Sequence, residues 1–290
     1  IRIAVLGGTG YLASIIKNQN NEKRNEFVFF SRKKKSKNYI NYSSFEKNFS
    51  LFKNFDYIIH LVGSNQKKLL QNKKLIKKKN KITSDICNLC LKNNIKLIYI
   101  SSLQIYQNYG IKNLYINSKI NIKSPYSTSH YQAEQIIKKK FKNNQNMFTI
   151  LRIGNVFGYK KYENLKEIKN NLVHGLCLSA LKNNKIIINN GSIQRSFIPS
   201  SIFVYVINLT IKRNIFKNSS INIFYKNYTL DQISKIIQKR FKLIYNKTIN
   251  IIVKKTNLNR KFIIFGDKNF ILKPKINKIN FEIDQILKNT

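Results

Sequence analysis

The sequence is poor in acidic residues, proline, histidine and cysteine, and each shortage excludes a class of protein. Its 290 residues include 12 Asp and Glu, 3 Pro, 3 His, 3 Cys and no Trp. So few prolines, together with 42% hydrophobic residues, exclude a wholly disordered chain because that much apolar surface can form a core. Three isolated histidines among sparse acids predict no metal site. No run of about 18 uncharged apolar residues occurs, so we expect no transmembrane helix.

The three cysteines, Cys87, Cys90 and Cys177, cannot form a disulfide framework. Cys87 and Cys90 lie in a helical-looking stretch, and we interpret them as packing residues rather than a redox pair. The first ten residues, IRIAVLGGTG, contain no apolar h-region and no cleavage site. We therefore expect a reducing, cytoplasmic setting and no membrane partner.

The chain is strongly basic, with 54 Lys and Arg, a formal charge of +42 and a pI near 10.2. Such an excess is typical of proteins that bind nucleic acids or anionic membranes. Here 46 of the cations are lysine and 42 further residues are asparagine, both encoded by A/T-rich codons. The lysines are spread along the chain, with runs at 33–37, 73–79 and 138–142. Because no nucleic-acid-binding motif accompanies them, we interpret the charge as a solvated basic surface and expect no nucleic-acid partner. A polyanion binder is the weaker alternative.

Short apolar runs alternate with amphipathic stretches through the first half of the chain. The predicted strands cover 1–6, 26–31, 57–62, 97–101 and 148–153 and are apolar on both faces, as parallel strands covered by helices are. Helices are predicted over 11–17, 73–92 and 126–141, the last opened by Ser124 and Pro125. This order predicts an α/β protein with a doubly wound, Rossmann-type parallel sheet.

After about residue 158 the pattern changes. A Lys/Asn/Glu-rich stretch precedes elements of mixed type: helices over 171–182 and 201–212, strands over 185–188 and 221–224, and a helix that begins at Thr229. We predict a dinucleotide-binding domain over 1–158. Residues 159–290 are predicted to form mainly a smaller α+β lobe, with some segments that return to the first domain.

A glycine-rich segment follows the first predicted strand and opens a helix. Glycine allows a sharp turn and lets the backbone approach a pyrophosphate, while the helix N-terminus offers N–H groups and a partial positive charge. Placed between a strand and a helix, the pattern strongly indicates a dinucleotide site. The residues concerned are Gly7, Gly8, Gly10, Tyr11, Leu12 and Ala13.

The end of the second strand selects between the two nicotinamide cofactors. An acid there bonds the ribose 2′-hydroxyl of NAD, whereas basic residues favour the 2′-phosphate of NADP. Here the strand ends in Ser31 and Arg32 and has no acid. NADP is therefore favoured over NAD.

Six motifs occur in order and with suitable spacing. They are the GxxGxxA segment at 7–13, DYIIHLVG at 56–63, YISSLQIY at 99–106, a Ser-Pro-Tyr to Ala-Glu segment at 124–134, LRIGNVFG at 151–158 and RSFI at 195–198. On these motifs the chain resembles the extended short-chain dehydrogenase/reductases, the NAD(P)-dependent epimerase/dehydratase family that acts on nucleotide sugars. The resemblance covers most of the chain and implies that the second lobe binds the substrate.

The resemblance also implies roles for individual residues. Ser102 corresponds to the hydroxyl that hydrogen-bonds the reacting oxygen, and Tyr126 to the acid/base that exchanges a proton with it. Arg195 corresponds to the arginine that holds the substrate diphosphate, a role that suits the fork of a guanidinium group. The residues that correspond to cofactor contacts are Leu61, Val62 and Gly63, and those that correspond to substrate contacts are Asn155 and Arg195.

One position departs from the family pattern. The family has Tyr-x-x-x-Lys, whereas here the fourth residue after Tyr126 is His130. In the family the lysine bonds the nicotinamide ribose, and its charge lowers the tyrosine pKa; bringing that pKa from ~10 to near neutrality is worth roughly 4 kcal/mol. A neutral imidazole at the same helical face keeps the hydrogen bond but not the charge. We therefore place His130 in both the catalytic and the cofactor-binding sites.

Two other Tyr-x-x-x-Lys pairs occur, at Tyr115 with Lys119 and at Tyr162 with Lys166. With 16 tyrosines and 46 lysines in 290 residues, about 2.5 such pairs are expected by chance. We favour Tyr126 because a helix start precedes it and the Ala-Glu pair follows it. Of the remaining histidines, His60 is interpreted as a structural residue beside the cofactor and His174 as a packed or half-exposed helix residue.

The sequence thus predicts an NAD(P)-dependent enzyme that epimerises a nucleotide-diphosphate sugar or reduces its 4-keto form, by a Ser/Tyr pair with hydride transfer to or from nicotinamide. Dehydration is disfavoured because Leu103 and Gln104 replace the Asp-Glu pair of the family's dehydratases. The alternative is a binding module, sensory or regulatory, that holds the dinucleotide but is weakened by His130. By resemblance, the protein is a possible homodimer.

Overall fold

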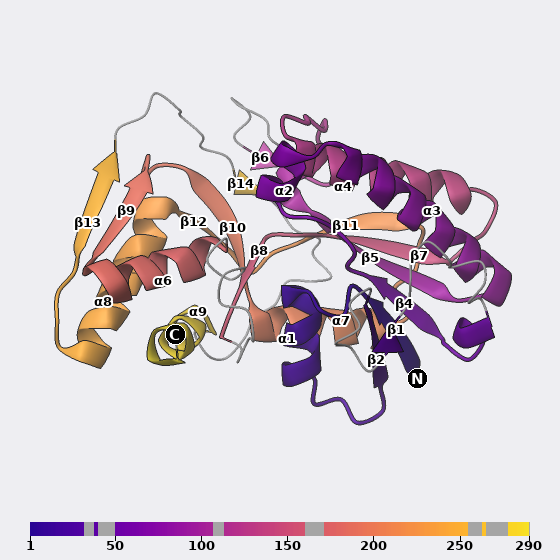
Figure 1. Cartoon of the computed structure of the whole chain (residues 1–290), viewed down its shortest axis with the longest axis horizontal. Coiled ribbons are helices and arrows are strands. Elements are labelled where there is room, and N and C mark those ends of the chain that lie inside the picture. Colours follow the sequence, from indigo (N-terminus) through magenta and orange to yellow (C-terminus); the bar gives the residue numbers. More distant parts are fainter. Residues whose placement is uncertain are drawn as a thin grey trace. The chain divides into compact units, whose positions relative to one another are not determined.

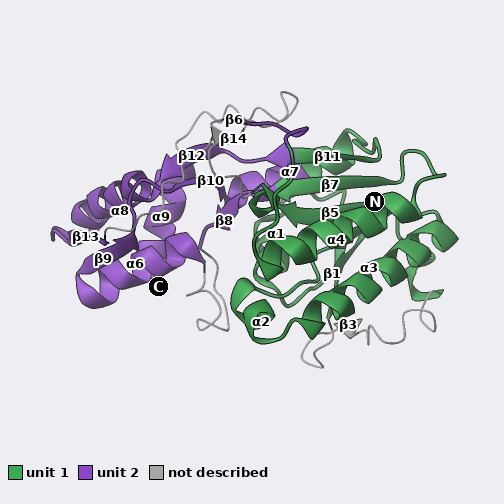
Figure 2. Cartoon of the chain, turned by 90° about the horizontal axis from the view of Figure 1, so that it is seen from above, with its two compact units in different colours: residues 1–107, 119–152, 208–221 green, residues 108–118, 153–207, 222–290 purple. Residues whose placement is uncertain are grey.

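The computed structural model describes residues 1–31, 38–39, 50–106, 113–159, 171–254, 263–264 and 278–289. The chain divides into two compact units (Figure 2). The first unit comprises 1–107, 119–152 and 208–221, and the second comprises 108–118, 153–207 and 222–290. The first unit is therefore assembled from three separate stretches of sequence.

The first unit is built on a seven-stranded sheet with the order β11-β7-β5-β4-β1-β2-β3. Its strands are β1 (Arg2–Leu6), β2 (Glu26–Ser31), β3 (Asn38–Tyr39), β4 (Tyr57–His60), β5 (Lys96–Ser102), β7 (Phe148–Ile153) and β11 (Ser219–Ile223). The pairs β1–β2, β1–β4, β2–β3 and β4–β5 are parallel. The strand order reverses between β1 and β4, and in such sheets ligands bind at the carboxyl ends of the strands that flank the reversal. The predicted doubly wound sheet is confirmed.

Helices cover both faces of this sheet. In Figure 1, α3 (Lys74–Asn93) and α4 (Pro125–Lys140) lie together on one face and α1 (Tyr11–Gln19) on the other, while α2 (Gln66–Gln71) precedes α3. Cys87 and Cys90 lie in the core that α3 and α4 share with the sheet. Both thiols are free, and burial raises the pKa of Cys87 to about 12. Their interpretation as packing residues is confirmed.

Helix α4 starts as the sequence predicts. The Ser124 hydroxyl accepts a hydrogen bond from the Ser127 backbone N–H at 3.1 Å, and the Ser127 side chain reaches back to the Ser124 N–H. This capping box satisfies N–H groups that the first turn leaves without partners, and Pro125 at the start loses nothing because it has no N–H. The start of α4 fixes where Tyr126 lies.

Asparagine takes the place of glycine at helix ends. The residues that end α3, α6 (Leu172–Asn183) and α8 (Leu230–Tyr245) are Asn94, Asn184 and Asn246, all left-handed. Every non-glycine residue with positive φ in the described ranges is an asparagine. The short polar side chain makes this conformation accessible, so a chain with 42 Asn and 10 Gly can still terminate its helices.

The second unit is a mixed α+β structure. Its sheets are β12-β10-β8, β13-β9 and β14-β6, and its core includes apolar residues of α6, α8 and α9. His174 is buried on α6, bonds the Gly158 carbonyl at 3.0 Å, and has its pKa lowered to about 4 by burial, so it is packed as expected. The remaining elements are β6 (Asn113–Leu114), β8 (Asn155–Phe157), β9 (Lys185–Asn189), β10 (Gln194–Pro199), α7 (Ser200–Lys212, whose last residues join the first unit), β12 (Lys226–Thr229), β13 (Asn250–Lys254), β14 (Ile263–Ile264) and α9 (Lys278–Asn289).

Candidate functional site

The glycine-rich loop lies at the carboxyl end of β1, beside the strand-order reversal. The N–H groups of Gly7 and Gly8 bond the Phe30 carbonyl at 3.1 and 2.8 Å, and Gly10 N–H bonds the Gly7 carbonyl at 2.9 Å. Gly10 then caps α1, whose first turn contains no acid and receives no side-chain cap. The positive end of the helix therefore meets no acidic side chain from its own first turn, which suits a phosphate.

The loop has no room for side chains. A Cβ at Gly7, where φ is +99°, would lie 3.0 Å from the Leu61 carbonyl carbon, and one at Gly8 would lie 3.0 Å from the Phe30 carbonyl oxygen. A Cβ at Gly10 would lie 3.2 Å from the Gly7 carbonyl oxygen. The predicted glycines are thus required by the turn itself, and the loop contacts the segment that follows β4.

Ser31 ends β2 next to the same loop. Its buried hydroxyl donates to Thr9 Oγ1 at 3.2 Å, which joins the end of the second strand to the glycine loop. Tyr11 and Leu12, in the first turn of α1, are half-buried. Arg32, which the sequence places beside the ribose, lies outside the described residues.

His60 shapes the segment after β4. Its Nδ1 accepts from the Val62 N–H at 3.2 Å, and its Nε2 lies 3.0 Å from the Thr83 hydroxyl. Because that hydroxyl already donates to the Lys79 carbonyl at 2.9 Å, Nε2 has to be the donor. Burial, with a smaller contribution from the Lys79 charge, lowers the pKa of His60 to about 3, so the ring is neutral. His60 therefore fixes the backbone ahead of Gly63, as its structural interpretation requires.

Ser102 and Tyr126 are brought together. Ser102 ends β5 and is buried, and its Oγ accepts from the Gln104 N–H at 3.2 Å at the start of the short helix η3 (Leu103–Ile105). The Ser102 hydroxyl forms a hydrogen bond with Tyr126, and this bond favours the phenolate. Burial of Tyr126 has the larger, opposite effect, so the pKa of Tyr126 is raised. The hydroxyl and the phenol thus form a pair at the carboxyl end of β5.

His130 stacks beside the phenol, one helical turn away. The His130 and Tyr126 rings have centroids 4.6 Å apart, and His130 Nδ1 lies 3.1 Å from the Tyr99 hydroxyl. Burial, then the charges of Lys79 and His60, place the His130 pKa well below its ordinary value. The imidazole is therefore neutral, and position 130 supplies no cation. Tyr99 was not predicted as a site residue, although it belongs to a motif that the sequence displays.

A buried ion pair positions α4 against the sheet. Arg152 on β7 bonds Glu134 through Nε at 3.0 Å and through a terminal nitrogen at 2.7 Å. Glu134 also accepts from the Ser101 hydroxyl at 2.6 Å, and Arg152 bonds the Tyr106 hydroxyl. Ser101 adjoins Ser102, so one network holds the helix of the phenol to the strand of the hydroxyl. The motifs contain these residues, but no sequence signal indicates that they pair.

The two predicted substrate contacts lie on neighbouring strands of the second unit. Asn155 on β8 faces Phe197 on β10 in the parallel register, and Arg195 lies two residues before Phe197. Because side chains alternate along a strand, Asn155 and Arg195 lie on the same face of this sheet. The Asn155 amide donates to the Ser196 carbonyl at 3.1 Å, which orients it.

The alternative tyrosines gain no support. Tyr115 is 51% exposed and begins a turn rather than a helix. Tyr162 and Lys166 lie outside the described residues. Among the described residues, no cluster of His, Cys, Asp and Glu could hold a metal ion, and no helix has the length and apolar character needed to cross a bilayer.

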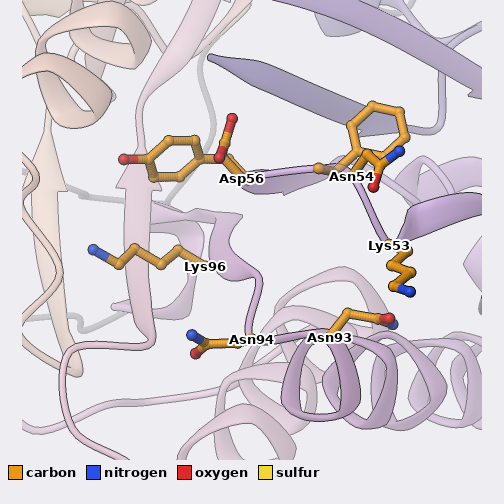
Figure 3. A pocket seen from close by; sticks show the side chains of 8 residues that line it. Lys53, Asn54, Asp56, Asn93, Asn94 and Lys96 are labelled. Carbon is orange, nitrogen blue, oxygen red and sulfur yellow. The ribbon is translucent and has the colours of Figure 1, made fainter.

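A pocket of about 420 Å³ opens at the opposite ends of the strands from the glycine loop (Figure 3). Its residues are the first residues of β4 and β5 and those just before them, so it lies at the amino ends of these strands. Ligands of doubly wound sheets bind at the carboxyl ends, and we do not assign this pocket to the site. Its lining comprises Lys53, Asn54, Phe55, Asp56, Tyr57, Asn93, Asn94 and Lys96.

Comparison with known proteins agrees with this geometry. The model of the NAD dependent epimerase/dehydratase family matches residues 3–223. No curated protein sequence matches the chain.

Solved structures share its fold at low identity. UDP-N-acetylglucosamine 4-epimerase from Methanobrevibacter ruminantium, in complex with UDP-N-acetylmuramic acid, is 20% identical with a TM-score of 0.80, covering 99% of this chain and 97% of that one. UDP-glucose 4-epimerase from Bifidobacterium longum, in complex with NAD⁺ and UDP, is 15% identical with a TM-score of 0.81, covering 100% and 99%. dTDP-glucose 4,6-dehydratase from Bacillus anthracis, in complex with NAD, is 18% identical with a TM-score of 0.79, covering 100% and 97%.

Proposed function

Because the chain belongs to the NAD dependent epimerase/dehydratase family, we propose that it is an NAD(P)-dependent enzyme that epimerises a nucleotide-diphosphate sugar or reduces its 4-keto form. The observation that carries this proposal is the Ser102–Tyr126 hydrogen bond at the carboxyl end of β5. A hydroxyl and a phenol that share one hydrogen bond can together grip one substrate oxygen. NAD and NADP both remain candidates, since Arg32 lies outside the described residues.

The residues of the glycine loop fit a dinucleotide. Side chains at Gly7, Gly8 and Gly10 would fill the cradle, and the acid-free start of α1 suits a pyrophosphate. A bound dinucleotide would supply the hydride chemistry: as NAD(P)⁺ it would take up and return a hydride in an epimerisation, and as NAD(P)H it would donate one in a reduction. The residues that we propose to hold the cofactor are Gly7, Gly10, Tyr11, Leu12, Ser31, Arg32, Leu61, Val62, Gly63, Tyr126 and His130.

Ser102 and Tyr126 handle the proton at the substrate oxygen. In the oxidative direction Tyr126 Oη takes the proton of the sugar 4-hydroxyl while Ser102 Oγ–H donates to the same oxygen. In the reductive direction Tyr126 returns that proton to the carbonyl oxygen as the carbon is reduced. Ser102 keeps its donor role in both directions because its Oγ accepts the Gln104 N–H, which leaves its own hydrogen for the substrate.

The protonation state of Tyr126 favours the reductive direction. Burial raises its pKa, so the phenol is protonated near neutral pH and ready to donate. Epimerisation needs both directions in turn, and its oxidative half requires a cation that stabilises the phenolate. His130 is neutral, so this cation has to come from elsewhere.

The second unit is the proposed substrate-binding lobe. Asn155 and Arg195 share one face of its three-stranded sheet, where an amide and a guanidinium suit sugar hydroxyls and a diphosphate. The similar epimerases bear uridine nucleotides in their names, which supports this class of substrate. As a division of labour along the chain, residues 1–158 would bind the cofactor and 159–290 mainly the substrate.

The test is a panel of nucleotide sugars and their 4-keto derivatives, supplied with NAD(H) or NADP(H), with Tyr126→Phe beside the wild type. We expect turnover of at least one compound and a fall of at least ~100-fold in kcat for Tyr126→Phe, the typical contribution of a general acid–base. Tyr115→Phe is the matched control and should keep full activity. Equal loss in both variants, or none in Tyr126→Phe, would contradict the assignment.

A second candidate function is a dinucleotide-binding module, favoured by the neutral imidazole at position 130. It predicts tight dinucleotide binding without turnover of any sugar in the panel. His130→Lys should then create activity, because it restores the missing charge beside Tyr126. If wild type already turns over a sugar, the module is excluded.

A further inference from the structure

Lys79 is buried although its neighbours in the same basic run are exposed. It is 5% exposed on α3, whereas Lys77 and Lys78 point to solvent. In a helix, residues three, four and seven apart share a face, and the residues at these spacings from Lys79 are Ile82, Thr83 and Ile86, all buried. The side chain therefore projects from the core face of α3 toward the sheet.

The Lys79 ammonium lies at the candidate cofactor site. Its Nζ is 5.6 Å from the centroid of the Tyr99 ring and 3.8 Å from where a Cβ on Gly63 would be. No hydrogen-bond acceptor or carboxylate of the described residues pairs with this nitrogen. Burial of an ammonium that has neither a counter-ion nor a hydrogen-bond acceptor is costly, so a buried lysine that lies over the Tyr99 ring beside Gly63 indicates a ligand.

A short chain of contacts joins this lysine to the phenol. The Tyr99 hydroxyl is 3.1 Å from His130 Nδ1, and the His130 ring lies against Tyr126 with centroids 4.6 Å apart. The Lys79 charge acts on His130 directly, since it is one of the causes that disfavour the imidazolium. The cation and the phenol thus flank the same imidazole.

We propose that Lys79 on α3 supplies the positive charge that His130 on α4 lacks, and that its ammonium binds the dinucleotide beside Gly63. The inference rests on the proposed function and names the residue that replaces the lysine of Tyr-x-x-x-Lys. His130 keeps the hydrogen-bonding position on α4, while the charge has moved to the neighbouring helix. As a positioning cation, Lys79 stabilises the phenolate of Tyr126 when that residue takes a proton, and it gives the dinucleotide a charged partner.

The electrostatics of the cluster support this role. Burial lowers the pKa of Lys79 to about 7, and Glu134 on α4 partly offsets the effect. The other titratable groups that face it are His60 on β4, Tyr99 on β5, and Tyr126 and His130 on α4. Burial lowers the pKa values of both imidazoles and raises those of both phenols relative to their ordinary values. An anionic ligand that prefers the ammonium form should therefore bind more weakly as the pH rises through 7.

The first test measures NADH affinity by the fluorescence of the bound cofactor, without any substrate. Methionine has nearly the volume of lysine, so Lys79→Met should fold, which its melting temperature verifies. We expect affinity to fall roughly 10- to 100-fold, the range of one charge-assisted hydrogen bond. Lys78→Met removes the same charge from the exposed face of the same helix and should change affinity less than about twofold. Equal affinities of the two variants would overturn the proposal.

The second test moves the charge back. His130→Lys in the Lys79→Met background places a lysine at the family position. We expect this double variant to bind NADH at least tenfold more tightly than Lys79→Met does. His130→Lys alone should gain nothing, because two cations would then share one site. A gain in the single variant, with no recovery in the double variant, would refute the relocation of the charge.

A pH series separates binding from packing. NAD⁺ affinity of the wild type should fall by up to tenfold per pH unit above about 7, and that of Lys79→Met should be flat. NAD⁺ is used because the 2′-phosphate of NADP titrates near this range. A wild type that binds NADH but turns over no sugar would refute the proposed function. The binding measurements on Lys79→Met would still test the role of Lys79, because they need no sugar. A sugar-active protein with a pH-independent NAD⁺ affinity would refute Lys79 alone.

Discussion

Replacement of Glu134 by leucine should show how strongly α4 depends on its buried ion pair. The Glu134 side chain is fully buried and that of Arg152 is 3% exposed, with terminal nitrogen and carboxylate oxygen 2.7 Å apart. Glu134→Leu leaves the guanidinium buried without its counter-ion, and loss of one partner of such a pair costs about 3–5 kcal/mol. At 2–4 °C per kcal/mol, the melting temperature of the first unit should fall by roughly 6–20 °C.

The assay is thermal unfolding followed by circular dichroism, with Glu26→Leu as control. Glu26 pairs with Arg2 at 3.3 Å in the same unit, and both side chains are exposed, at 63% and 42%. A pair in solvent contributes little, so this variant should shift stability by no more than about 0.5 kcal/mol. The double variant Glu134→Leu/Arg152→Met removes both charges together and should recover most of the loss.

Two outcomes would refute this reasoning. One is a single variant that loses less than about 1 kcal/mol, which would mean that water or another group compensates Arg152. The other is a double variant as unstable as the single one, which would attribute the loss to packing rather than to the uncompensated charge. The rate should also fall in the single variant, because the network orients α4 and with it Tyr126.

Three further predictions concern the loop, the substrate contact and the buried imidazole. Gly7→Ala should weaken NADH binding at least tenfold, since its Cβ would press on Leu61 in a left-handed conformation; unchanged affinity in titration would exclude a tight loop. Arg195→Lys should raise the KM for the nucleotide sugar several-fold and leave NADH affinity intact, because a single ammonium replaces a bidentate fork; a change in NADH affinity would argue against a substrate role. His60 has its pKa lowered to about 3 in the folded protein, so the unfolded chain binds the extra proton and stability should fall by up to about 1.4 kcal/mol per pH unit below 6.5. Denaturant unfolding of His60→Asn should show a shallower slope over this range, and an identical slope would assign the pH dependence to other groups.

The strands of the first unit could be predicted because burial on both faces leaves continuous apolar runs. β1, β2 and β7 match their expected ranges to within one residue, and the Ser124 cap marks the start of α4. The strands of the second unit are short and only partly buried, so their pattern is weak. The sequence shows β8 and β10 only as motifs, and their pairing, which places Asn155 opposite Phe197 and on the same face as Arg195, depends on a contact distant in sequence.

The buried polar contacts of the site were harder to predict. Ser102 and Tyr126 follow from their motifs, whereas the Tyr99–His130 hydrogen bond requires β5 and α4 to pack in a particular register. The interpretation of the run at 73–79 as solvated lysines is wrong for Lys79, which is buried. Its spacing from Ile82 and Ile86 was the available signal, but five lysines in seven positions concealed it.

The shortage of acids bears on what a buried lysine can pair with. The carboxylate that acts on Lys79 from α4 is Glu134, and its two oxygens are already engaged by Ser101 and Arg152. It can therefore moderate the Lys79 charge at a distance but cannot form a salt bridge with it. In a chain with 12 acids and 54 cations, other carboxylates are scarce, and a cation that cannot be paired internally remains available to an anion from outside. A pyrophosphate-containing cofactor bound beside Gly63 would supply that anion, which is why a histidine at position 130 is compatible with a working site.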